Sequence, residues 1–129
     1  MPTIYAELSI TSKKTNLREI SKITGITPAD EHEINEITDR GYILDHSLWR
    51  YETEIFETYD MDYVSSQFLM TFKDSSDDLS DFIHKNECDV IIYFVIGDVT
   101  DEMPVLTISK EMIKFAARLN ANIDFDGHA

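Results

Sequence analysis

The amino-acid sequence predicts an α+β protein built as a two-layer α/β sandwich, with about four strands and helices between them. Two observations lead to this prediction. Apolar and polar residues alternate in several short segments, which is the period of a half-buried strand. Between them, apolar residues recur three and four positions apart, which is the period of a helix with one buried face. The expected order is strand, helix, strand, helix pair, strand, helix, strand, in a single domain over residues 1–129.

The first two elements are a strand and a short helix. Residues 3–10 alternate, with an apolar residue at every second position, and this predicts a strand with one buried face. The helix is expected to begin after Asn16, a suitable N-cap with Glu19 three residues later. Gly25 supplies the left-handed position that ends a helix, and Pro28 prevents its continuation.

A polar segment and a strand come next. Residues 29–41 are acidic, and we expect a loop or a short, weak helix that ends near Gly41. A strand is predicted over residues 47–53, with Trp49 and Tyr51 on the same face. The sequence therefore predicts no strand between residue 10 and residue 47.

Two helices follow. Asp60 or Asp62 is the expected cap of the first, in which Val64, Phe68 and Phe72 recur every fourth residue. Ser75 or Ser76 starts the second, and its apolar residues are Leu79, Phe82 and Ile83.

The last third of the chain predicts a strand, a helix and a final strand. Residues 90–96 are a continuous β-branched and aromatic run, typical of a central strand buried on both faces. Ser109 is expected to cap the last helix, and Asn120 is expected to end it. The residues predicted to be buried in this helix are Met112, Ile113, Ala116 and Ala117. Residues 122–126 alternate and predict a strand at the end.

The acidic residues are concentrated in two stretches. The formal net charge is −14 over 129 residues. Residues 29–62 contain eleven acidic residues against two arginines, and residues 74–102 contain nine against one lysine. The basic residues gather instead on the first and last helices. Such a charge attracts basic partners and repels nucleic acid and anionic membranes, so neither is an expected partner.

Residue patterns that would indicate catalysis are missing from the sequence. The four histidines lack metal-binding spacings, and no G-x-S-x-G elbow or glycine-rich phosphate loop occurs. Cys88, the single cysteine, lies between Glu87 and Asp89, whose charges raise a thiol pKa and so disfavour a nucleophile. We therefore expect a non-enzymatic protein without metal or cofactor. With no signal-peptide pattern and no apolar run of about 20 residues, the expected location is cytoplasmic.

Aromatic residues inside the first acidic stretch have two interpretations. Trp49 and Tyr51 lie in a predicted strand, where one face must be buried, and this favours a place in the core. Phe56 and Tyr59 lie among acidic residues, and aromatics in such surroundings are also typical of a hot spot for a basic partner. The sequence leaves core and hot spot equally open for these last two.

Three local patterns resemble one bacterial family. The first helix closes with Gly25, Ile26, Thr27 and Pro28; a tryptophan strand, Ser47-Leu-Trp-Arg-Tyr-Glu52, follows; and the last helix leads into Ala121-Asn-Ile-Asp-Phe-Asp126. In this order and spacing most of the chain resembles the family known as domain of unknown function 4279. The resemblance implies a small α/β fold and no established activity. Small bacterial domains of this kind are frequently encoded beside toxin genes as immunity proteins.

The leading hypothesis is a bacterial immunity protein that neutralises a basic toxin, such as a nuclease, by electrostatic attraction and occlusion. The expected partner is therefore a basic protein. The alternative is a domain that binds a small ligand or a metal in a pocket lined by aromatic residues. The candidate partner-binding residues are the acidic side chains around the aromatic segment and in the loop after residue 97, namely Glu52, Glu54, Glu57, Asp60, Asp62, Asp98, Asp101 and Glu102.

Overall fold

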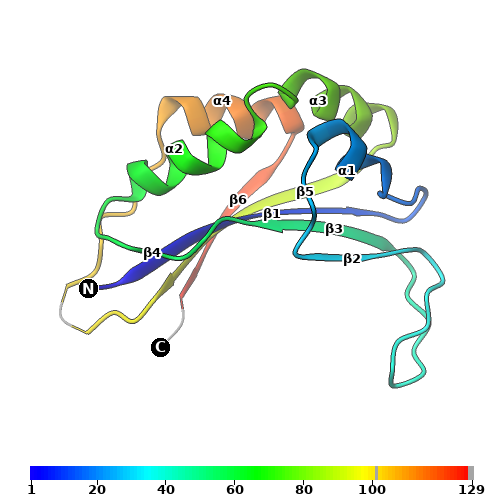
Figure 1. The fold of residues 1–129 in the computed structure, drawn as a ribbon, viewed down its shortest axis with the longest axis horizontal. Helices are drawn as coiled ribbons and strands as arrows, with labels where there is room; N and C mark the ends of the chain where they lie inside the picture. The colour runs from blue at the N-terminus through cyan, green and yellow to red at the C-terminus, as the bar shows by residue number, and fades with distance from the viewer. Residues whose placement is uncertain (101, 128–129) are drawn as a thin grey trace.

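The sheet and its helices form two layers. The computed structural model describes residues 1–100 and 102–127, in which six strands form one sheet and all four helices cover one of its faces (Figure 1). The strands are β1 Thr3–Ser12, β2 Asp30–His32, β3 Ser47–Glu52, β4 Phe56–Glu57, β5 Asp89–Gly97 and β6 Asn122–Gly127. The helices are α1 Glu19–Thr24, α2 Met61–Phe72, α3 Ser76–Lys85 and α4 Lys110–Leu119. The predicted architecture is confirmed, but the prediction of about four strands omitted the short β2 and β4.

The first strand is the centre of the sheet. The strand order is β2-β3-β1-β5-β6, and β4 pairs with the start of β1. β1 runs antiparallel to β3, β4 and β5, whereas β6 runs parallel to β5. As predicted, β5 is an interior strand, but helices cover only one of its faces. The other face of the sheet is left open, and we call it the open face.

The core lies between the sheet and the helices. Successive side chains of β1 point to opposite faces of the sheet, so Ile4, Leu8 and Ile10 all face the helices, and all three are fully buried. Trp49 of β3 is also fully buried, and its indole N–H donates to Ser21 Oγ of α1 at 3.0 Å. The core interpretation of Trp49 is therefore correct, and this side chain is not available to a partner.

The helix ends confirm most of the predicted caps. Asp60 accepts from the Tyr63 N–H at 3.2 Å, and Ser109 accepts from the Met112 N–H at 3.2 Å. Gly25 and Asn120 end α1 and α4 in the left-handed conformation, with φ of 72° and 55°. The last helix differs in one respect, because Ile113 and Ala117 are exposed and Phe115 and Leu119 are buried in their place.

The capping prediction for Asn16 was wrong. The first helix begins only at Glu19, and no side chain caps it. Instead, the Asn16 Oδ1 atom accepts from the Ile34 N–H at 2.9 Å. This residue therefore fastens the segment after β2 to the start of the helix layer.

The predicted loop or weak helix at residues 29–41 is a strand followed by a projecting arm. Residues 30–32 form β2, which pairs antiparallel with β3 and adds an edge strand to the sheet. Residues 33–46, which we call the arm, then fold back on themselves through a bridge between Ile37 and Ile43. Gly41, at φ 82°, supplies the left-handed position in its turn. Figure 1 shows the arm extending beyond the sheet on the side away from the helices.

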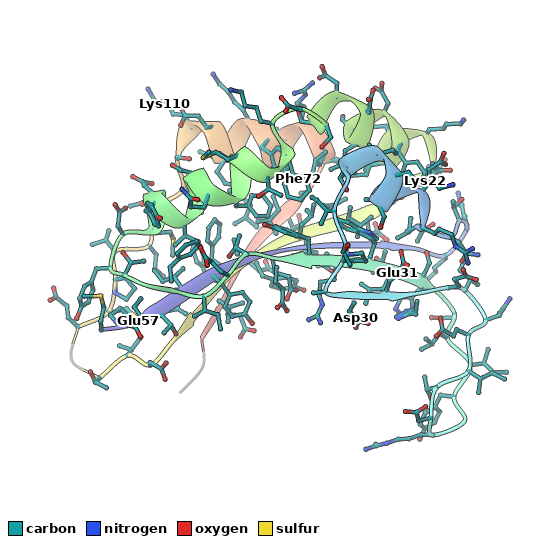
Figure 2. The ribbon with its side chains drawn as sticks, viewed as in Figure 1. Lys22, Asp30, Glu31, Glu57, Phe72 and Lys110 are labelled. Atoms are coloured by element: carbon teal, nitrogen blue, oxygen red, sulfur yellow. The ribbon has the colours of Figure 1, made fainter. Side chains whose placement is uncertain are left out.

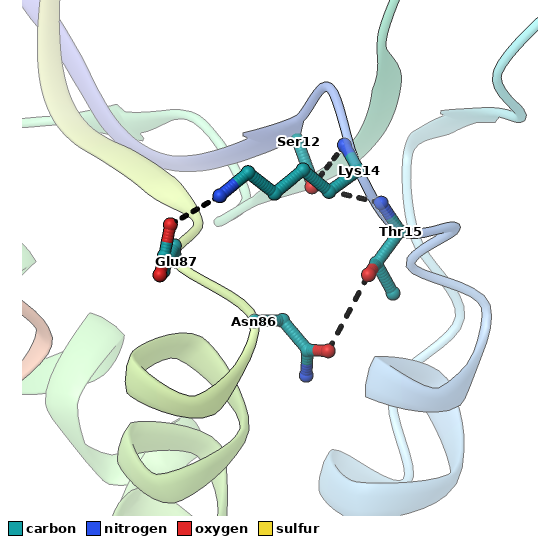
Figure 3. Close-up of polar contacts among 5 residues, drawn as sticks. All are labelled: Ser12, Lys14, Thr15, Asn86 and Glu87. Atoms are coloured by element: carbon teal, nitrogen blue, oxygen red, sulfur yellow. Dashed lines mark hydrogen bonds and ion pairs between the residues drawn. The ribbon is translucent and has the colours of Figure 1, made fainter.

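Two turns at one end of the sheet are joined by polar contacts (Figure 3). The Ser12 Oγ atom accepts from the N–H groups of Lys14 and Thr15, both at 3.1 Å. The Thr15 hydroxyl donates to Asn86 Oδ1 at 3.4 Å, and Lys14 forms an ion pair with Glu87. Lys14 lowers the pKa of the Glu87 carboxyl by hydrogen bonding and by its charge. These contacts link the connection after β1 to the connection between α3 and β5.

Candidate functional site

The open face of the sheet is a surface that the helices leave uncovered. Its centre is hollowed, with a volume of about 440 Å³ lined by residues from β1, β2, β3, β5 and β6. Strand register brings Glu52, Glu7, Tyr93 and Asp124 into one row across four strands. Tyr5, Val95 and Asp126 form the next row. Carboxylates from separate parts of the sequence therefore meet on one face.

Arg50 is the one basic side chain among the residues that line this hollow. Its guanidinium lies 3.4 Å from Glu7, 3.3 Å from Glu52 and 3.8 Å from Asp30. Glu7 and Glu52 are directly opposite each other on neighbouring strands, an arrangement that is unfavourable without a cation between them. Arg50 therefore stabilises the centre of the open face. It is one cation beside three carboxylates, and Asp124 and Asp126 bring the number of carboxylates on this face to five.

Burial changes the acidity of the groups in the hollow. The Glu7 side chain is 12 % exposed. Burial raises its pKa, Arg50 lowers it and Glu52 raises it again. Burial also raises the pKa of Tyr5 and Tyr93, and neighbouring carboxylates raise both further. The two phenols stay neutral at physiological pH and offer their rings and hydroxyl groups to a ligand, while the carboxylates around them favour a cationic one.

The arm carries exposed apolar side chains on the side of the sheet that the helices leave open (Figure 1). Ile37, Tyr42 and Ile43 are 67 %, 68 % and 69 % exposed. The arm also carries four acidic residues and one basic one, namely Glu33, Glu36, Asp39, Asp45 and Arg40, and Glu33 forms an ion pair with Arg18. Apolar groups exposed to this extent inside a polar rim are typical of protein–protein contact surfaces.

Three of the predicted partner-binding residues lie on the open face or at one end of the sheet. Glu52 lies on the open face beside Arg50. Glu57 and Asp98 lie at one end of the sheet, because Thr3 pairs with Glu57 on one side and with Gly97 on the other. The two acidic stretches of the sequence thus meet at this end. Figure 2 shows Glu57 far from Glu31, so the first acidic stretch is itself spread over the molecule.

The remaining predicted residues have separate surroundings. Glu54 and Glu102 are exposed. Asp62 accepts from the Thr107 hydroxyl at 3.5 Å, which holds the segment before α4 against the start of α2. Asp101 lies outside the described residues. Phe56 is partly buried against the core and packs edge-on against Tyr63, whereas Tyr59 is 43 % exposed.

Asp60 has a structural use, and this leads to a prediction. Because its carboxylate accepts from the Tyr63 N–H, Asp60→Ala is expected to lower the free energy of unfolding by about 1 kcal/mol. Asp60→Ser removes the charge and keeps a capping oxygen, so it should retain most of the stability. Urea unfolding of both variants measures this difference. Equal losses in the two variants would mean that the charge, and not the cap, is what stabilises α2.

The other candidate chemistries find little support in the structure. Burial, and then Asp89, raises the pKa of the Cys88 thiol to about 11, which leaves it protonated and unreactive at neutral pH. Among the described residues, no three His, Cys, Asp or Glu side chains gather in a way that could hold a metal ion. None of the helices in the described part of the chain is long and apolar enough to cross a bilayer.

Comparison with known proteins identifies the family. The family described as domain of unknown function (DUF4279) matches residues 2–129, and the chain therefore belongs to it. Neither the comparison with curated proteins nor the comparison with solved structures gave a match. Membership of this family brings no established activity with it.

Proposed function

We propose that this protein is a non-enzymatic interaction protein that binds a basic protein partner, and specifically an immunity protein that occludes a basic toxin domain in the cytoplasm. The observation that supports this best is the open face, where five carboxylates lie on four strands and a single arginine pairs with three of them. A surface with such an excess of negative charge steers a cationic partner toward it and accelerates association.

The arm supports the same function in a different way. Its exposed tip, Ile37, Tyr42 and Ile43, offers apolar area of the kind that slows dissociation once a complex has formed. The open face and the arm lie on the same side of the sheet (Figure 1). One partner can therefore contact the acidic face and the apolar tip together. Glu57 and Asp98 at the end of the sheet, together with the exposed Glu102, remain a second proposed contact region.

The test begins with the gene that precedes this one. We expect it to encode a protein with a basic C-terminal domain, and that purified domain is the probe. Association is measured at several salt concentrations for the unmodified protein and for the triple variant Asp30→Lys, Asp124→Lys, Asp126→Lys. Another triple variant, Asp74→Lys, Asp78→Lys, Asp81→Lys, reverses the same number of exposed acidic residues in and beside α3. A third reverses Glu57, Asp98 and Glu102.

The open-face variant is expected to associate at least about tenfold more slowly, with a flatter salt dependence, because steering depends on charge at the contact surface. The α3 variant should change the rate much less, although its net charge is the same. Equal slowing in both variants would show that net charge alone matters. A housekeeping gene at the neighbouring position would count against the immunity role.

A small-molecule function is the second candidate, and the hollow itself is what favours it. Two tyrosines and several converging carboxylates in about 440 Å³ are suitable for an organic cation. A thermal-shift screen with amines, guanidinium compounds, other metabolites and divalent metals separates the two functions. A large, reproducible shift that is lost in Glu7→Gln would favour the small ligand over the protein partner.

A further inference from the structure

A second surface lies on the opposite layer of the molecule, in a groove between α2 and α4. Its volume is about 500 Å³. The lining residues are Ser66, Leu69, Met70 and Phe72 of α2, its C-cap Lys73, Ser76 of α3, and Glu111, Lys114, Phe115 and Arg118 of α4. Positions 111, 114, 115 and 118 follow the spacing i, i+3, i+4, i+7, as do positions 66, 69, 70 and 73, so each helix contributes a stripe of about two turns. The groove therefore runs along both helices.

The two helices run in the same direction along this groove. The segment before α4 contacts the start of α2, where Thr107 Oγ1 donates to Asp62. At the other end, the Arg118 guanidinium donates to Ser76 Oγ at 3.2 Å. Between these points Phe72 and Phe115 pack with ring centroids 5.7 Å apart. A channel two turns long, or about 10 Å from the helical rise, matches the contact stripe of one further short helix.

The apolar residues of the groove are accessible to different extents. Phe72 and Phe115 are buried, whereas Met70 is 68 % exposed and Leu69 is partly buried. Methionine has a flexible, polarisable side chain that adapts to different apolar partners. A helix that covered this stripe would remove apolar area from water, which is the main source of favourable binding energy for an amphipathic helix.

The rim of the groove has a charge opposite in sign to the net charge of the whole chain. Lys73, Lys114 and Arg118 lie along it, and Glu111 is the single acidic residue of the lining. Arg118 forms an ion pair with Asp77, while Lys73 and Lys114 form none within the described part of the chain. A chain of net charge −14 thus presents two unpaired lysines beside an apolar channel.

We infer that this groove binds an amphipathic helix whose apolar stripe is flanked by acidic residues. Charge complementarity selects this occupant, because acidic flanks would pair with Lys73 and Lys114. A second copy of the chain suits the groove less well. Two copies repel each other through their net charges of −14, and two grooves that faced each other would bring their cations together, because each lining has three cations against one acid. The groove is separate from the open face, and a helix can bind there whether or not the open face binds a basic protein.

The test is a display library of amphipathic helices about 14 residues long. Apolar residues are fixed at i, i+3, i+4 and i+7, and the flanking positions are randomised. The library is selected against the unmodified protein and against Lys73→Glu, Lys114→Glu. The control target is Lys22→Glu, Lys110→Glu, which reverses two lysines outside the groove (Figure 2). A further pair, Met70→Ser and Ile113→Ser, compares exposed apolar residues inside and outside the groove.

We expect acidic flanks to be enriched on the unmodified and control proteins. Affinities in the micromolar range should fall at least about tenfold in Lys73→Glu, Lys114→Glu and in Met70→Ser, and stay unchanged in Ile113→Ser. Enrichment without acidic flanks, or enrichment that survives both groove variants, would overturn the inference. So would an empty selection, or a dimer seen by sedimentation that Met70→Ser dissociates, because the groove would then belong to a second copy.

Discussion

Replacing Phe68 with alanine is expected to lower the free energy of unfolding by about 3–5 kcal/mol. The side chain is fully buried at the centre of an aromatic cluster. Its ring centroid lies 5.2 Å from that of Phe72, 5.6 Å from Phe115 and 6.2 Å from Tyr51. Truncation loses these contacts and leaves a cavity that three neighbouring rigid rings cannot fill.

Urea unfolding measures this prediction, with the midpoint falling and the slope unchanged. Met70→Ala on the same helix is the matched control, because its side chain is 68 % exposed and the change should cost less than about 0.5 kcal/mol. A loss below about 1 kcal/mol for Phe68→Ala would contradict the tight packing between α2, α4 and the sheet.

Replacing Arg50 with methionine is expected to cost about 2 kcal/mol at pH 7, because it leaves Glu7 and Glu52 facing each other without a cation. Methionine keeps the apolar stem, so the loss reports mainly on charge. Burial already raises the pKa of Glu7, and removing Arg50 raises it further. The cost should therefore shrink as the pH falls toward 4.5, the ordinary value for this carboxyl, because Glu7 then binds a proton in the folded protein.

The double variant Glu7→Gln, Arg50→Met is the control for this prediction. It removes the like-charged pair, so it should recover most of the stability at pH 7 and lose the dependence on pH between 4.5 and 7. Unfolding curves at the two pH values give the comparison. A cost for Arg50→Met that stays constant with pH would assign the effect to packing and remove Glu7 from its cause.

The sequence contained enough information for the long elements of the fold. Clear capping residues, such as Gly25 at the end of α1 and Ser109 at the start of α4, marked the ends of helices whose apolar residues repeat regularly. The strands β2 and β4 were missed because three and two residues are too few to show alternation. Asn16 was misassigned because its bond to Ile34 spans 18 residues of sequence, and a capping pattern is a purely local signal.

The open face could be predicted only in part. Alternation in β1 placed Tyr5 and Glu7 on one side of the strand, and alternation in β6 did the same for Asp124 and Asp126. Which strands become neighbours depends on the sheet order, and no local pattern encodes it. The predicted residues were therefore those in dense acidic stretches, whereas the carboxylates that meet around Arg50 come from several distant parts of the chain.

The central position of β1 also determines when the sheet can form. This strand precedes the other five in the sequence, and its residue Ile4 pairs with Ile96 of β5, which comes much later in the chain. Closing such a long loop has a high entropic cost before any contact is made, and folds dominated by distant pairings are slow to assemble. During synthesis, β3 can pair with one edge of β1, but the other edge stays free until residues 89–97 have left the ribosome. For this chain the most vulnerable period is thus the interval before β5 is synthesised, when a strand that belongs at the centre of the sheet still has a free edge.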